Sequence, residues 1–76
     1  MQELITCIAQ SLVDQPEEVK VTLVEEEDTV TVELAVAPED LGKVIGKQGR
    51  TARAMRSLLS AAAANFDKRS RLEIIE

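Results

Sequence analysis

The sequence predicts an α+β domain whose elements follow the order helix, strand, strand, helix, helix, strand. Apolar residues recur at helical spacing near the start of the chain and again after Gly49. Between these stretches, apolar and polar residues alternate with the period of half-buried strands, and a short strand-like run ends the chain. With 76 residues, we expect one domain over residues 1–76, of marginal stability and therefore prone to bind a second copy or a partner.

The first predicted helix covers residues 2–14 and is stopped by Asp14-Gln15-Pro16. Its apolar residues recur at helical spacing: Leu4, Ile5, Ile8, Leu12 and Val13. Cys7, the only cysteine, is expected on or beside the buried face, where a cysteine behaves as a small apolar side chain. A reactive thiol is the less favoured interpretation.

Two strands follow and are predicted to form a hairpin. Apolar residues alternate with polar ones in both runs: Val19, Val21 and Leu23 in the first, and Val30, Val32, Leu34 and Val36 in the second. The acidic stretch Glu25-Glu26-Glu27-Asp28 between them is interpreted as a solvated turn. It is not a catalytic acid pair, because such a pair needs its members in different environments.

Two helices and a strand complete the predicted order. Ala37-Pro38-Glu39-Asp40 predicts a helix start, because proline suits the first helical position and acids suit the positive end of the helix dipole. This second helix is short, since Gly46 follows soon after it. The third helix runs from Gly49 or Arg50 to about Asn65, and the last strand covers residues 71–75. The third helix directs five residues toward the core: Ala52, Met55, Leu59, Ala62 and Phe66.

Missing residue types exclude several kinds of chemistry. The chain has no histidine and one cysteine, so it lacks the commonest general base and the donors for a zinc site. No nucleophile, base and orienting group can be assembled, and no catalytic residue, metal or cofactor is expected. The sequence also shows no leader and no apolar run long enough to cross a membrane. We therefore expect a cytoplasmic protein that is not an enzyme.

The net charge of −5 is unevenly distributed along the chain. Residues 1–40 carry 1 basic and 11 acidic side chains, a net charge of −10, whereas residues 41–76 carry 8 basic and 3 acidic, a net charge of +5. Five basic residues follow one another with no acid between them: Lys43, Lys47, Arg50, Arg53 and Arg56. A charge run is usually a solvated helix face, but the unbroken sign beside two glycines favours a nucleic-acid-binding face.

The stretch Ile45-Gly46-Lys47-Gln48-Gly49-Arg50 is predicted to be a tight link between two helices. Glycine tolerates positive φ and lets another backbone approach closely, and free amides at the start of the third helix favour an anion such as phosphate. Lys47 adds a positive charge and Gln48 a hydrogen-bonding group. The alternative is an ordinary helix C-cap followed by a turn glycine. The spacing fits neither a nucleotide-binding P-loop nor a dinucleotide site.

The sequence VIGKQGRTARAM, residues 44–55, resembles the G-x-x-G signature of KH domains, and the predicted order of elements resembles the type II arrangement. Over essentially the whole chain the sequence is similar to the KhpA family of small bacterial RNA-binding proteins. The resemblance implies an α+β, type II KH fold with a three-stranded mixed sheet and three helices on one face. It also implies a noncatalytic protein that holds about four nucleotides of single-stranded RNA and acts as an RNA chaperone or post-transcriptional regulator.

In KH domains the G-x-x-G loop holds the phosphate backbone and a shallow apolar groove receives the bases. The expected RNA-binding residues are Ile45, Gly46, Lys47, Gln48 and Gly49 from the resemblance, and Lys43, Arg50 and Arg53, which we add from charge and helical spacing. Ile45 and Val44 are expected to contribute both to the lining of the groove and to the packing of the core, and the sequence does not assign either role to one of them. Phe66 is the only aromatic residue, so stacking of bases on aromatic side chains is not expected. Single-stranded DNA stays an alternative ligand.

A second, small apolar stripe on the third helix consists of Ala54, Leu58 and Ala61. It predicts a homodimer through this helix, although helix propensity explains an alanine-rich run equally well. The resemblance adds a KhpB-type KH protein as a heterodimer partner. The alternative function is a protein-interaction adaptor that keeps the KH fold and acts mainly by dimerising; the intact basic loop favours RNA binding over it.

Overall fold

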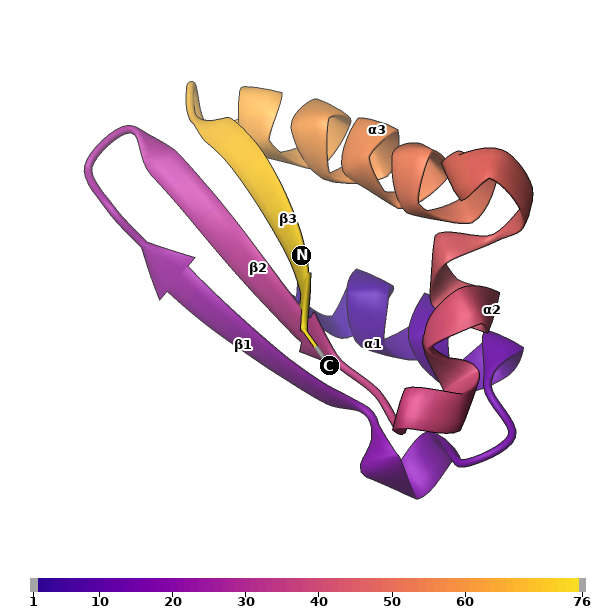
Figure 1. The fold of residues 1–76 in the computed structure, drawn as a ribbon. Helices are drawn as coiled ribbons and strands as arrows, with labels where there is room; N and C mark the ends of the chain where they lie inside the picture. Colours follow the sequence, from indigo (N-terminus) through magenta and orange to yellow (C-terminus); the bar gives the residue numbers. More distant parts are fainter. Residues whose placement is uncertain (1, 76) are drawn as a thin grey trace.

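The computed structural model describes residues 2–75 and confirms the predicted α+β order (Figure 1). In chain order the elements are α1 (Gln2–Leu12), β1 (Lys20–Glu25), β2 (Thr29–Ala35), α2 (Leu41–Ile45), α3 (Arg50–Ala64) and β3 (Arg69–Ile75). One-turn 3₁₀ helices occupy three of the links: Pro16–Glu18, Pro38–Asp40 and Lys47–Gly49.

The sheet has the strand order β1-β2-β3, with β2 antiparallel to β1 and parallel to β3. All three helices lie on one side of this sheet (Figure 1). The register pairs Leu23 with Val32 and Val32 with Leu72, so one apolar row crosses all three strands on the side that the helices cover. This is the mixed sheet of the type II KH fold, as the sequence predicted.

The hydrophobic core lies between the central strand β2 and the three helices. Its members come from every helix and from β2, β3 and the residue that follows β2: Ile5, Ala9, Val30, Val32, Leu34, Val36, Val44, Met55, Leu59 and Leu72. The predicted core positions of β2 are confirmed, because Val30, Val32 and Leu34 are all fully buried, but the alternation is incomplete, since Thr31 between them is buried as well. The hairpin and α3 are therefore fixed to each other through one shared core.

A buried acid ties the end of α1 to the start of α2. Asp40 is only 1% exposed, and its carboxylate accepts hydrogen bonds from the backbone amides of Asp14 (3.2 Å) and Gln15 (3.0 Å). Lys43 Nζ lies 3.6 Å from the same carboxylate and also donates to the Asp14 carboxylate. A buried carboxylate needs such partners. Asp40, predicted only as part of a helix start, therefore also fixes the position of α2.

Cys7 is exposed, so its predicted place on or beside the buried face of α1 is wrong. The buried residues of α1 are Ile5 and Ala9. Cys7 follows Ile5 by two positions, which turns it about 200° around the helix axis and points it into solvent. The helix itself ends at Leu12, two residues before the predicted end, although the amide of Val13 still bonds to the Ala9 carbonyl.

The end of α3 also differs from the prediction. The core position near this end is taken by Ala63, whereas Ala62 is half-buried and Phe66 is 65% exposed. The helix stops at Ala64, and the amides of Asp67 and Lys68 bond back to the carbonyls of Ala64 and Ala63. With Asp67 in the left-handed region at φ 57°, these bonds form a Schellman motif that turns the chain immediately after Phe66. The last strand then begins at Arg69, two residues earlier than predicted.

Candidate nucleic-acid interface

The link between α2 and α3 has the positive φ angles that the glycines predicted. Gly46 ends α2 with φ 78°, and Gly49 precedes α3 with φ 72°. Gln48 lies between them and also has a positive φ, 57°, which the sequence did not indicate for a residue with a side chain. Three left-handed residues within four positions reverse the chain between the two helices.

The two glycines have different structural roles. A Cβ atom at Gly46 would lie 2.2 Å from Thr51 Oγ1 and 2.9 Å from the Thr51 backbone nitrogen, so this side of Gly46 is filled by the first turn of α3. A Cβ atom at Gly49 would meet nothing within 4 Å. The open side that a ligand's backbone could approach is therefore at Gly49, while Gly46 lets the link close onto α3.

The backbone amides at the start of α3 are less free than the sequence predicted. The Gly49 amide bonds to the Gly46 carbonyl at 3.1 Å, and the Arg50 amide bonds to the Lys47 carbonyl. For these two amides the expectation of unpaired donors is wrong, because the link forms its own 3₁₀ turn. An anion at this end of α3 would be held mainly by the helix dipole and by side chains.

Four of the predicted site residues gather around the link. Lys47 and Gln48 are exposed on it. Arg53 Nη2 donates to the Gln48 backbone carbonyl at 3.4 Å, and Arg50 Nη2 lies 3.5 Å from Gln48 Oε1. Both contacts are long and use one of five N–H donors on each guanidinium, so the remaining donors are available for a phosphate.

Lys43 is not part of this group. Its ammonium contacts the Asp14 and Asp40 carboxylates on the side of α2 that faces the end of α1. The hydrogen bond to Asp14 and the charges of both acids raise the pKa of Lys43 above its ordinary value, against a smaller opposing effect of desolvation. Two protein acids therefore already neutralise the charge that the sequence suggested for RNA.

The adjacent residues Val44 and Ile45, which the sequence could not separate, have different environments. Val44 is fully buried in the core, whereas Ile45 is 37% exposed immediately before Gly46. Successive residues on a helix point about 100° apart, so only one of the two can face the core. Ile45 is the aliphatic side chain available beside the link.

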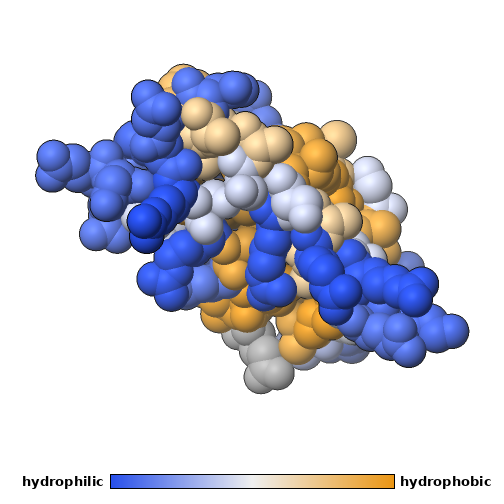
Figure 2. Space-filling view, turned by 90° about the horizontal axis from the view of Figure 1, so that it is seen from above, coloured by the Kyte–Doolittle hydropathy of each residue, from blue (hydrophilic) through white to orange (hydrophobic). Residues whose placement is uncertain are grey.

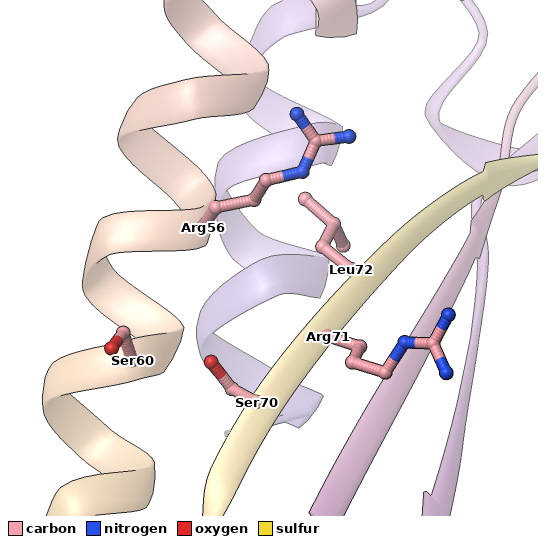
Figure 3. A pocket seen from close by; sticks show the side chains of 5 residues that line it. All are labelled: Arg56, Ser60, Ser70, Arg71 and Leu72. Atoms are coloured by element: carbon pink, nitrogen blue, oxygen red, sulfur yellow. The ribbon is translucent and has the colours of Figure 1, made fainter.

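A groove between α3 and β3 extends the basic surface away from the link (Figure 3). It has a volume of about 400 Å³ and is lined by Arg56 and Ser60 from α3 and by Ser70, Arg71 and Leu72 from β3. In Figure 3 Arg56 reaches from α3 toward β3, whereas the Arg71 guanidinium projects away from the helix. The sequence pattern did not indicate Ser70, because only the packing of β3 beside α3 brings this residue near Arg56.

The basic residues of α3 and the apolar stripe lie on different sides of the helix. Arg53, Arg56 and Ser60 share one flank, whereas Arg50 lies one turn before Ala54 on the same row as the stripe, about 9 Å along the helix axis from Arg56. Ala54, Leu58 and Ala61 are exposed about 130° away around the helix. Viewed from above, bands of hydrophilic side chains cross this region with hydrophobic surface between them (Figure 2). A partner on the stripe would therefore leave Arg53 and Arg56 accessible and would lie one turn from Arg50.

No three His, Cys, Asp or Glu side chains among residues 2–75 lie close enough together to hold a metal ion. Within the same residues, no helix has both the length and the apolar character to cross a bilayer.

Comparison with known proteins identifies the family. Residues 2–74 match the family model described as "KhpA/KhpB, KH domain". A protein of Clostridium acetobutylicum named "RNA-binding protein KhpA" is 55% identical over 75 residues, covering 99% of this chain and 100% of the relative. Proteins of the same name are 51% identical in Listeria monocytogenes, over 100% of both chains, and 49% identical in Aquifex aeolicus, over 100% of this chain and 96% of the relative.

No solved structure is significantly similar to the chain. The family match and the relatives cover nearly every residue, and they agree with the type II KH order of elements. On this evidence the chain belongs to the KhpA/KhpB family of KH domains.

Proposed function

We propose that this protein is a noncatalytic, cytoplasmic single-stranded RNA-binding protein that holds the RNA backbone at the link between α2 and α3. The observation that carries the proposal is the exposed cationic link, with Gly49 open on its side-chain face and Lys47, Arg50 and Arg53 gathered around it. The curated relatives, named as RNA-binding proteins, support the same function. Through this binding the protein acts as an RNA chaperone or post-transcriptional regulator.

The phosphate backbone approaches over Gly49, where no side chain blocks it. The 15-residue helix α3 directs the positive end of its dipole at this point. Lys47 provides a mobile charge, Gln48 a hydrogen-bonding amide, and Arg50 and Arg53 the flanking guanidinium groups. These parts match the way KH loops clamp about four backbone nucleotides.

The rest of the bound strand follows the basic flank of α3 into the groove against β3. Arg56 supplies further charge there, and Ser60 and Ser70 supply hydroxyl groups that can donate or accept hydrogen bonds. Ile45 offers an aliphatic surface for a base beside the link. Lys43 contributes little, because its ammonium is already paired with Asp14 and Asp40.

The test is fluorescence anisotropy with short unstructured RNAs at low and moderate salt, comparing the native protein with Lys47→Asp/Gln48→Asp, which retains both glycines. The matched control is Lys20→Glu/Gln10→Glu, which changes the net charge equally at two exposed positions outside the link and the groove. We expect the native protein and the control to bind and the link variant, still folded by circular dichroism, to lose most of its affinity. Equal binding by both variants would refute the clamp. Single-stranded DNA of the same sequence tests discrimination of the ribose.

A second function is favoured by the exposed stripe on α3. Leu58 is 45% exposed and lies between Ala54 and Ala61 on a face that no other part of the described chain covers. We propose that this face pairs with a second copy of the chain or with a KhpB-type KH protein, a pairing that leaves the basic flank free. Light scattering over a micromolar concentration series should show a dimer that Leu58→Asp converts to a monomer. A native protein that stays monomeric throughout would exclude the homodimer.

A further inference from the structure

The hairpin end of the molecule carries an apolar cleft that RNA binding does not use. Phe66 is 65% exposed, the highest value among the large exposed apolar side chains of residues 2–75. Together with Leu23, Glu25 and Lys68 it lines a cleft of about 250 Å³ between β1 and the segment that joins α3 to β3. This volume is below the usual range of about 300–1,000 Å³ for small-molecule sites, and suits one or two side chains of a protein partner.

An unpaired strand edge lies next to this cleft. The strand β1 is at the edge of the sheet, and the bond from the Glu26 amide to the Thr29 carbonyl (2.8 Å) sets the alternation of its backbone groups. Counting back in twos from Glu26, Val24 and Thr22 direct their amides and carbonyls toward β2. The backbone groups of Leu23 and Glu25 therefore point outward.

A side chain from α1 supports this assignment and limits the free edge. Gln2 Nε2 donates to the Val21 carbonyl at 2.8 Å, which places that carbonyl on the outer side of β1, as the alternation requires. Gln2 therefore protects the part of the edge near Val21. The outward groups of Leu23 and Glu25 lie beyond it, beside the cleft, and are available to a further strand.

The charge at this end specifies the chemistry of the strand that could bind. Glu25, Glu26, Glu27 and Asp28 are exposed, and none forms an ion pair within residues 2–75. They would repel a phosphate backbone, and they would repel the same hairpin of a second copy. They attract lysine and arginine, whereas Lys68 in the cleft would repel them, so the basic side chains of a partner would lie over the acids and not in the cleft. The hairpin tip also lies at the other end of the molecule from the α2–α3 link (Figure 1).

We propose that the outer edge of β1 binds an extended, basic segment of a partner protein, which adds to the sheet as a fourth strand. Backbone hydrogen bonds to Leu23 and Glu25 supply the pairing, as in other cases of strand addition. One apolar side chain of the segment packs against Leu23 and Phe66. Its basic neighbours lie opposite Glu25 at the end of β1 and the acidic turn at residues 26–28, which starts one residue later than the sequence predicted. A partner bound here leaves the basic link and the groove free.

The proposal can be tested by NMR with the ¹⁵N-labelled full chain and the peptide Lys-Val-Lys-Leu-Lys-Val-Lys. We expect saturable shifts of the amides at Leu23 and Glu25 and little change at Lys47 and Gln48. A peptide with glutamate in place of every lysine, and one N-methylated at alternate amides, should not bind. Binding should survive in Lys47→Asp/Gln48→Asp, which separates this site from the RNA clamp.

The decisive variant is Phe66→Ser, which should weaken peptide binding at least about tenfold, as expected for an aromatic anchor. Leu4→Ser, which removes another exposed apolar side chain, is the matched control and should bind as the native protein does. Glu25→Lys/Glu26→Lys should also lose binding. Absence of saturable shifts at millimolar peptide, equal binding by Phe66→Ser, or equal binding of the glutamate peptide would each overturn the proposal.

Discussion

We expect Gly46→Ala and Gly49→Ala to differ strongly in their effect on the free energy of unfolding, although both replace a positive-φ glycine of the same link. At Gly46 the backbone has φ 78° and ψ 171°, a combination that is essentially restricted to glycine and costs about 1–3 kcal/mol for other residues. The added methyl group would also overlap Thr51, which adds about 1–3 kcal/mol for overpacking. The sum of about 2–6 kcal/mol is comparable to the total stability expected of a domain of this size.

At Gly49 the cost should be much smaller. The backbone has φ 72° and ψ 14°, the ordinary left-handed region, which costs a residue with a Cβ about 1–2 kcal/mol. No atom lies within 4 Å of the added methyl group. The same open side is where we propose that RNA approaches, so Gly49→Ala should lower RNA affinity while the protein stays folded. Gly46→Ala should act through stability first.

The assay is urea unfolding followed by far-UV circular dichroism at constant protein concentration, because the chain has no tryptophan or tyrosine to report by fluorescence. A double variant, Gly46→Ala/Thr51→Ala, is an informative companion. It should not restore stability, since the Thr51 Cβ and backbone nitrogen, at 2.7 and 2.9 Å from the added atom, remain. Equal destabilisation by the two single variants, or a loss below about 1 kcal/mol at Gly46, would refute the reasoning.

Three further predictions concern other parts of the chain. Asp40→Ala should lower the free energy of unfolding by about 2–4 kcal/mol, because the amides of Asp14 and Gln15 lose their acceptor. Asp40→Asn should lower it by less. Urea unfolding that gives the same value for both variants would contradict this prediction. Asp67→Gly should stabilise the fold by about 0.5–1 kcal/mol and Asp67→Val should destabilise it, since Asp67 is the left-handed residue of the α3 C-cap. A valine variant more stable than the glycine variant would exclude the Schellman assignment. The logarithm of the RNA-binding constant should fall with the logarithm of the salt concentration with a slope of about −2 to −3, and Arg53→Gln should reduce the magnitude of this slope by about 0.7. An unchanged slope in anisotropy titrations would show that Arg53 does not contact the RNA backbone.

The sequence alone determined the order of elements and the positive φ angles of the two link glycines. Both depend on short-range effects: the apolar spacing along one helix or strand, and the freedom of glycine to take positive φ at Gly46 and Gly49. It also indicated that Lys47, Gln48, Arg50 and Arg53 lie together, since all are within seven residues on one link and the first turn of α3. The predicted ends of elements were wrong where capping hydrogen bonds determine the last helical residue, as at Phe66, which lies beyond the last turn of α3.

Only the tertiary structure decided which of these residues are available to a ligand. Lys43 is paired with Asp14, 29 positions away in the sequence, and Ser70 is brought near Arg56 by the packing of β3 against α3. The two glycines look alike in the sequence, yet one is closed by Thr51 and the other is open. Such differences depend on contacts between segments distant in sequence and on how chains fill space, and neither leaves a periodic signal in the residues themselves.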